Sequence, residues 1–254
     1  MTYLYKTYEV IGAVVKFGYF ATALLCDRVV VVKWRGHMGT AEIIFILEVV
    51  GTIAFALAGA MIAVEKNMDI FGVNVLGLTT AVGGGMIRDL ILGIHPPNMF
   101  RNPVYAVLAI CVSSLLFVTI YYFKRYLTYK FRVIYDKAIL ISDAVGLGIF
   151  TVVGINTGMN EGQNGTVLLI FIGVLTGVGG GMLRDMMAGM TPFIFVKHVY
   201  ACASIAGAVT YIYLHRVLEE VPAMAIGASV VVVIRMLAAH YKWNLPRIKP
   251  QEKK

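Results

Sequence analysis

The chain has 254 residues, of which 59% are hydrophobic and only 14% are charged, and its mean hydropathy is +0.80. A soluble domain is about 45–50% apolar and about 25% charged, so the apolar surplus indicates a membrane protein. The net charge of +8 is explained by lysines and arginines that flank membrane spans. Composition therefore excludes a disordered chain, disfavours a soluble enzyme and gives no reason to expect nucleic-acid binding.

Seven apolar segments are long enough to cross a bilayer, for which a helix needs about 20 mainly apolar residues. Charged residues separate these segments, and the second and fifth are rich in glycine. The sequence therefore predicts an all-α membrane protein with seven transmembrane helices. We expect these helices over residues 42–64, 70–93, 103–123, 138–158, 166–189, 199–215 and 221–239.

Residues 1–41 form an N-terminal extension with three open interpretations. Residues 10–32 are apolar enough to resemble a span, yet they include Lys16, Asp27 and Arg28. The extension is an eighth span, a helix on the membrane surface, or the product of a start codon assigned upstream of the true start at Met38. We favour the last two interpretations together over a true span.

The two halves of the chain are copies of one unit. Residues 80–89, which read TAVGGGMIRD, match residues 176–185, which read TGVGGGMLRD, at an offset of 96. Upstream of this motif, Glu48 matches Asp143 at an offset of 95. Because each copy contains three spans, the second copy enters the membrane upside down, which makes an inverted repeat. We expect a first repeat at 42–123, a basic loop at 124–137, a second repeat at 138–215, a seventh helix at 216–240 and a basic tail at 241–254.

Lysines and arginines set the expected orientation, because cytoplasmic loops carry an excess of both. The loop after the third span and the tail after residue 240 lie on the same side of a seven-span protein, so we expect a cytoplasmic C-terminus. Tyrosines interleave with the loop charges, which suits affinity for anionic lipids, although ordinary topology already explains those charges. The candidate lipid-binding residues are Lys124, Arg125, Lys130, Arg132 and Lys137.

Each repeat carries three consecutive glycines in its middle span. Glycine in a helix costs roughly 1 kcal/mol relative to alanine. Small residues allow close helix packing, but three adjacent glycines point around the whole helix, so a kink or break explains them better. Backbone freed in this way is tolerated where it lines a cavity. We therefore expect the second and fifth helices to be kinked and to line an ion or substrate path at Gly83, Gly84, Gly85, Gly179, Gly180 and Gly181.

Charged side chains beside the glycines are candidates for the lining of that path. A charge within a span is costly and usually paired, and adjacent residues on a helix do not face each other. We therefore expect the two arginines of the motifs to pair with Glu48 and Asp143. If all six groups are ionised they carry a net charge of −2, which favours cations. The six groups are Glu48, Arg88, Asp89, Asp143, Arg184 and Asp185.

Two other interpretations apply to the polar groups. The Arg-Asp pairs could instead anchor the helix ends at the membrane interface. Thr80 and Thr176 could add hydroxyl oxygens to the path, but threonines within membrane helices more often bond to their own preceding turn.

The sequence gives no support for an enzyme, a cofactor or a structural metal. A phosphate-binding loop needs a lysine followed by serine or threonine after its glycines, whereas here Met-Ile-Arg-Asp and Met-Leu-Arg-Asp follow. The three cysteines and five histidines are scattered singly, without the spacing of a metal site.

Two three-span repeats, each with GGGxxRD in its middle helix, followed by a seventh helix, resemble the prokaryotic trimeric intracellular cation (TRIC) channel family, also classed as a glycine transporter domain family. The resemblance covers about residues 40–240. It implies a homotrimer in a prokaryotic plasma membrane, one hourglass-shaped pore per subunit, and conduction of monovalent cations, potassium prominently and sodium with it. The alternative is a secondary transporter of glycine or a similar small amino acid, because inverted repeats with broken helices suit both.

Overall fold

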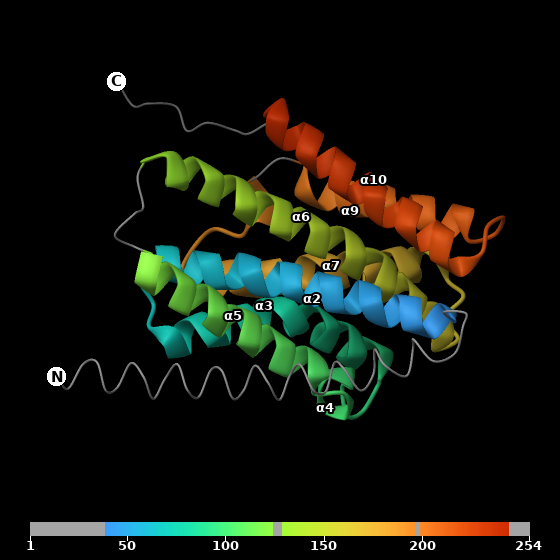
Figure 1. Ribbon diagram of the computed structural model, residues 1–254. Helices are drawn as coiled ribbons and strands as arrows, with labels where there is room; N and C mark the ends of the chain where they lie inside the picture. Colours follow the sequence, from blue (N-terminus) through green and yellow to red (C-terminus); the bar gives the residue numbers. More distant parts are fainter. Residues whose placement is uncertain (1–38, 124–128, 197–198, 244–254) are drawn as a thin grey trace, which may run out of the picture.

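The computed structural model describes residues 39–123, 129–196 and 199–243, and within them the regular structure is entirely helical (Figure 1). The helices are α2 (Thr40–Glu65), α3 (Ile70–Leu92), α4 (Asn98–Arg101), α5 (Val104–Phe123), α6 (Tyr129–Asn160), α7 (Thr166–Met187), α8 (Phe193–Val196), α9 (Tyr200–Leu214) and α10 (Glu220–His240). The predictions made for residues 1–38, for Lys124 and Arg125, and for the end of the tail lie outside the described residues.

Six of the described helices, namely α2, α3, α5, α6, α7 and α10, are long and apolar enough to cross a membrane. The prediction of an all-α membrane protein is therefore confirmed. The sixth predicted span corresponds to α9, which has 15 residues. A helix of that length rises only about 22 Å, less than the hydrocarbon thickness of about 30 Å. The count of seven spans therefore stays a prediction.

These segments form helices because a backbone in lipid must satisfy its hydrogen bonds internally. The side chains of the helices are apolar on the outer surface of the bundle as well as in its core. Large apolar side chains such as Phe71, Leu115 and Phe171 are exposed on the outer surface of the bundle. A soluble protein would keep this much apolar surface away from water. The outward-facing side chains are thus suited to contact lipid.

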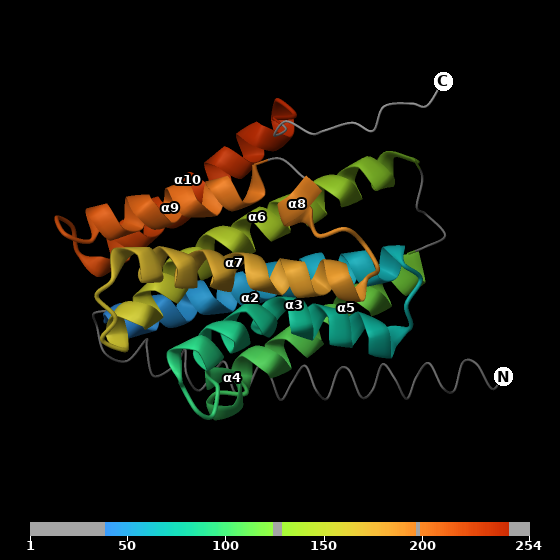
Figure 2. The same ribbon diagram turned by 180° about the vertical axis from the view of Figure 1, so that it is seen from behind.

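Four helices, α2, α3, α6 and α7, form the centre of the bundle and pack against one another. Helix α5 packs against α2 and α3 on one side, whereas α9 packs against α6 and α7, and α10 against α9 and α6, on the other (Figures 1 and 2). Helices α2, α3, α4 and α5 correspond to α6, α7, α8 and α9 in the two repeats. Among the described helices, α10 has no counterpart.

The helix ends show where local sequence sets the boundaries. Asp69 precedes α3 and its side chain accepts a hydrogen bond from the Gly72 amide at 2.8 Å, which satisfies a donor of the first turn. Gly93 ends α3 in the left-handed conformation, with a φ of 72°, which glycine adopts at no steric cost. Helix α6 begins at Tyr129, so it extends into the segment predicted as a basic loop.

Candidate functional site

The two middle helices cross at their glycine triplets. A Cβ atom built on Gly84 would overlap the carbonyl oxygen of Thr176 and would lie 3.2 Å from the Gly180 amide nitrogen. A Cβ atom on Gly180 would overlap the carbonyl oxygen of Thr80 in the same way. Only glycine allows backbones to approach this closely. The central glycine of each triplet therefore holds α3 against α7, antiparallel, in the middle of the bundle.

The first and third glycines have other surroundings. A Cβ atom on Gly83 would crowd the Leu183 side chain, and one on Gly181 would lie 3.0 Å from the Tyr200 hydroxyl. In contrast, a Cβ atom on Gly85 would meet only the Arg88 guanidinium, at 3.9 Å. One triplet thus serves helix packing at its centre and leaves open space at Gly85.

Helices α3 and α7 are helical throughout their triplets, over Ile70–Leu92 and Thr166–Met187. The predicted break in the helix is therefore absent from the described conformation, and the predicted kink stays a prediction. The close crossing gives the physical reason for this outcome. Each central glycine is packed against the backbone of the other helix. This contact stabilises the helical conformation of both segments at the positions where glycine by itself disfavours it.

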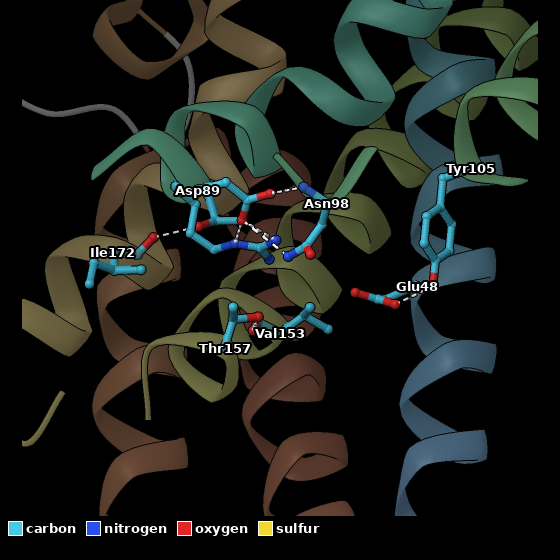
Figure 3. A network of polar contacts seen from close by, with 9 residues as sticks. Glu48, Asp89, Asn98, Tyr105, Val153, Thr157 and Ile172 are labelled. Atoms are coloured by element: carbon cyan, nitrogen blue, oxygen red, sulfur yellow. Dashed lines mark hydrogen bonds and ion pairs between the residues drawn. The ribbon is translucent and has the colours of Figure 1, made fainter. Parts of the chain in front are cut away.

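The first-repeat cluster consists of Glu48, Arg88, Asp89, Asn98 and Tyr105. Figure 3 labels Glu48, Asp89, Asn98 and Tyr105 of this cluster. Arg88 donates to Asp89 Oδ1 from Nε at 2.9 Å and from Nη2 at 2.7 Å, and both side chains are buried. The backbone amide of Asn98 donates to Asp89 Oδ2 at 2.7 Å. Asp89 therefore holds both its arginine neighbour and the first residue of α4.

Glu48 takes a different partner in the same cluster. The Tyr105 hydroxyl, on α5, donates to Glu48 Oε2 on α2. This contact corrects the prediction that one of the motif arginines pairs with Glu48. The prediction failed because it assumed that neighbours on a helix cannot pair, whereas the long Arg88 side chain folds back to reach Asp89.

A pocket opens beside this cluster. Its volume is about 50 Å³, and because a water molecule needs roughly 10–15 Å³ measured in this way, it has room for a few waters or a partly hydrated ion. Its polar lining comes from the first-repeat cluster and Thr52, and its apolar lining includes Phe150 and Met99, with Gly85 contributing bare backbone.

The second-repeat cluster consists of Asp143, Arg184, Asp185, Phe193, Tyr200 and Arg235. Arg184 is fully buried; its Nη1 donates to Asp143 Oδ1 at 2.7 Å and its Nε to Asp185 Oδ1 at 2.9 Å. The Phe193 amide donates to Asp185 Oδ2 at 2.7 Å, which reproduces the contact between Asn98 and Asp89. The prediction that one of the motif arginines pairs with Asp143 is thus confirmed, with Arg184 in that place, but Asp185 is a partner as well.

Aromatic rings and a second arginine cover this second cluster. The Phe193 ring of α8 lies 5.0 Å from the Arg184 guanidinium carbon. Arg235 of α10 lies with Nη2 3.5 Å from Asp143 Oδ2 and with its guanidinium carbon 4.4 Å from the centre of the Tyr200 ring. Sequence reasoning missed Arg235, although a charge inside an apolar span is a recognisable signal.

The threonines of the motifs bond to their own helices. Thr80 donates to the Leu76 carbonyl and Thr176 to the Ile172 carbonyl, each at 2.6 Å. Both hydroxyls are buried. The two threonine hydroxyls therefore already have hydrogen-bond partners within their own helices, which argues against a function as ion ligands in this conformation.

Two aromatic rings meet near the centre of the bundle. Phe55 of α2 and Phe150 of α6 correspond in the two repeats at an offset of 95, and their rings stack with centroids 5.3 Å apart. Phe55 is almost fully buried, whereas Phe150 also lines the first-repeat pocket. The stacked pair thus lies where the pocket meets the bundle centre.

The described residues contain no group of three or more histidine, cysteine or acidic side chains placed to hold a metal ion. Of the candidate lipid-binding residues, Lys137 is exposed on α6. Lys130 and Arg132 belong to the first turn of α6, and their side chains lie outside the described part.

The glycine transporter family matches residues 45–121 and 140–216, which coincide with the two repeats. The inner membrane protein YadS of Escherichia coli (strain K12) is 36% identical over 207 residues, which cover 80% of this chain and 95% of YadS. The membrane protein YvgT of Bacillus subtilis (strain 168) is 33% identical over 202 residues, covering 79% of this chain and 94% of YvgT.

Solved structures of TRIC channels are similar over most of the chain. A prokaryotic TRIC channel crystallised in 0.5 M KCl is 30% identical, with a TM-score of 0.72, over 81% of this chain and all of its own. The TRIC trimeric intracellular cation channel orthologue from Rhodobacter sphaeroides is 31% identical, with a TM-score of 0.70, over 79% of this chain and 98% of its own.

Proposed function

We propose that this chain, which belongs to the glycine transporter family that includes the TRIC channels, is a cation-selective channel that prefers potassium. The observation that carries the proposal is the first-repeat pocket, which is lined by two carboxylates and one guanidinium, in a fold similar to those of TRIC cation channels. When all three groups are ionised, the net charge of −1 at this pocket attracts cations and repels anions.

The relatives are named as membrane proteins of prokaryotes, and the chain is a multi-pass protein of the prokaryotic plasma membrane. Within that setting we propose a homotrimer in which each subunit carries its own path, because the similar structure from Rhodobacter sphaeroides is that of a trimeric intracellular cation channel orthologue. We further propose that the C-terminus is cytoplasmic and that the basic segment at 124–137 contacts anionic lipids.

The proposed path begins at the first-repeat pocket, passes the stacked rings of Phe55 and Phe150, and continues along the glycine triplets to the second-repeat cluster. In the described conformation the rings are packed and α3 and α7 are closely joined. We propose that conduction requires α3 and α7 to bend at their triplets and the two rings to separate. We also propose that α9, together with α8, forms the sixth of seven spans in chain order.

Potassium flux through liposomes that contain the purified trimer tests this proposal. We expect a cation-selective flux that Glu48→Gln lowers, because the substitution removes a carboxylate that faces the pocket. Glu65→Gln is the matched control, since it makes the same change in the same helix at an exposed position at the other end. Equal loss of flux in both variants would show that cations do not pass through this pocket.

The same liposomes separate the channel from the amino-acid transporter. A channel passes potassium without added substrate and shows unitary currents in a planar bilayer. If the protein carries no current and takes up glycine in a saturable manner, the channel proposal is wrong. The control for both assays is empty liposomes of the same lipid composition.

A further inference from the structure

The two ends of the inverted repeat carry different charges. The first-repeat cluster holds two carboxylates, of Glu48 and Asp89, and one guanidinium, of Arg88, which gives a net charge of −1 when all three are ionised. The second-repeat cluster holds the equivalent groups of Asp143, Asp185 and Arg184 and adds a further guanidinium. Its net charge is therefore zero. The difference comes from one residue.

That residue is Arg235, which lies on α10, the helix outside the repeat. Its side chain is 1% exposed, and Nη2 approaches Asp143 Oδ2 at 3.5 Å. Helix α10 packs against α9 and α6 of the second repeat, so it brings the arginine to this cluster. None of the described helices takes the equivalent place beside the first-repeat cluster, which opens into the pocket.

A second arginine is not needed to stabilise the acidic groups. Asp143 already accepts a hydrogen bond from Arg184 at 2.7 Å, and Asp185 accepts from Arg184 and from the Phe193 amide. Within the described part of the chain, Arg184 Nη2 is buried without a hydrogen-bond partner, so Arg184 alone has a donor to spare for these carboxylates. Placing a further charge within a span is costly, which argues that Arg235 has a function besides packing.

We propose that Arg235 neutralises the second-repeat end of the cation path and thereby limits the rate at which cations pass that end. The inference rests on the proposed function, since it assumes that cations follow this path. Removing the charge of Arg235 gives the second-repeat cluster the same net charge of −1 as the first. Helix α10 thus acts as the element that sets the conductance of one end.

The size of the effect follows from Coulomb's law. A unit charge changes the energy of an ion about 4 Å away, even at the effective dielectric constant typical of partly buried protein groups. This change in energy is larger than the change in activation free energy that alters a rate tenfold. We therefore expect Arg235→Met, which keeps the length of the side chain and removes its charge, to raise potassium flux at least about tenfold. Arg235→Lys keeps the charge and is expected to conduct like the wild type.

Two variants of the partner residue make the test specific for charge. Asp143→Asn leaves two arginines and one carboxylate, so the cluster becomes positive and flux is expected to fall about tenfold by the same reasoning. The double variant Asp143→Asn/Arg235→Met is neutral again and is expected to conduct at the wild-type level. A role in packing alone would make each substitution harmful and the double variant the worst.

The experiment measures potassium flux from KCl-loaded liposomes, with trimer content checked by size-exclusion chromatography. Arg216→Met is the matched control, since it removes the same charge from the exposed turn before α10 and is expected to leave flux unchanged. If Arg235→Met does not assemble, the comparison of Asp143→Asn with the double variant decides, because the proposal requires the double variant to conduct faster.

The outcomes distinguish this inference from the proposed function. Absence of potassium flux through the wild-type protein would overturn the channel itself. Flux through the wild type that stays unchanged, or falls, in Arg235→Met and does not recover in the double variant would overturn only the function of Arg235.

Discussion

Replacing Gly84 and Gly85 by alanine, one at a time, separates the two functions of the glycine triplet. At Gly84 the new methyl group would overlap the Thr176 carbonyl oxygen and lie 3.1 Å from its carbon. Ordinary carbon contacts lie at about 3.5–4 Å, so α3 and α7 must separate by roughly 1 Å. Overpacking of this kind costs about 1–3 kcal/mol, which exceeds the gain of about 1 kcal/mol from replacing glycine in a helix.

At Gly85 the same substitution meets open space. Apart from the neighbouring backbone of α3, the nearest atom to the new methyl group is Arg88 Nη2, at 3.9 Å. The helix propensity of alanine then makes Gly85→Ala as stable as the wild type or more stable. The methyl group does extend into the first-repeat pocket, which Gly85 lines. We therefore expect Gly85→Ala to assemble normally and to pass less potassium.

The assay is thermal: the detergent-solubilised trimer is heated in steps and the fraction that remains in the trimer peak is measured by size-exclusion chromatography. We expect the Gly84→Ala midpoint to fall by several degrees and the Gly85→Ala midpoint to stay or rise. Flux is then measured for the variant that assembles. If Gly84→Ala is as stable as the wild type, the close crossing of α3 and α7 does not exist in the membrane.

Substitutions at Phe150, Asp89 and Asp185 test the aromatic and charged contacts. Phe150→Leu is expected to raise potassium flux, because it removes half of the stacked pair with Phe55; unchanged flux in liposomes would exclude the rings from the path. Asp89→Asn is expected to cost about 3–5 kcal/mol by leaving a buried arginine without its carboxylate. Asp185→Asn is expected to cost less, because the neighbouring arginine retains Asp143, and thermal stability of the two trimers checks the order.

The large features of the fold were predictable because they rest on long-range regularity. Apolar segments of about 20 residues predict membrane helices, and the copy of residues 80–89 at 176–185 predicts that the two middle helices are equivalent. The structure places these segments on α3 and α7, at one crossing. What the pattern did not predict is that the central glycines serve the contact between these two helices.

The details of the charged clusters could not be predicted, because they depend on side-chain conformation and on packing between distant helices. Arg88 reaches its own neighbour Asp89 by folding its long side chain back, and helix geometry alone argued against that pairing. Arg235 reaches Asp143 only because α10 packs against α6. A residue 92 positions away in sequence from its partner leaves no local signal of the contact.

Duplication alone would give a path with two identical ends, and the contacts show where this protein departs from that symmetry. The pairs Glu48 and Asp143, and Tyr105 and Tyr200, occupy equivalent positions at an offset of 95. In the first repeat the tyrosine bonds to the acid and the pocket stays open, whereas in the second repeat the tyrosine ring lies beneath Arg235. An added helix can therefore change one end of an inverted repeat without changing the repeat itself, because it supplies a charge from outside. The symmetric core then provides the helix crossing, and α10 determines how the two ends differ.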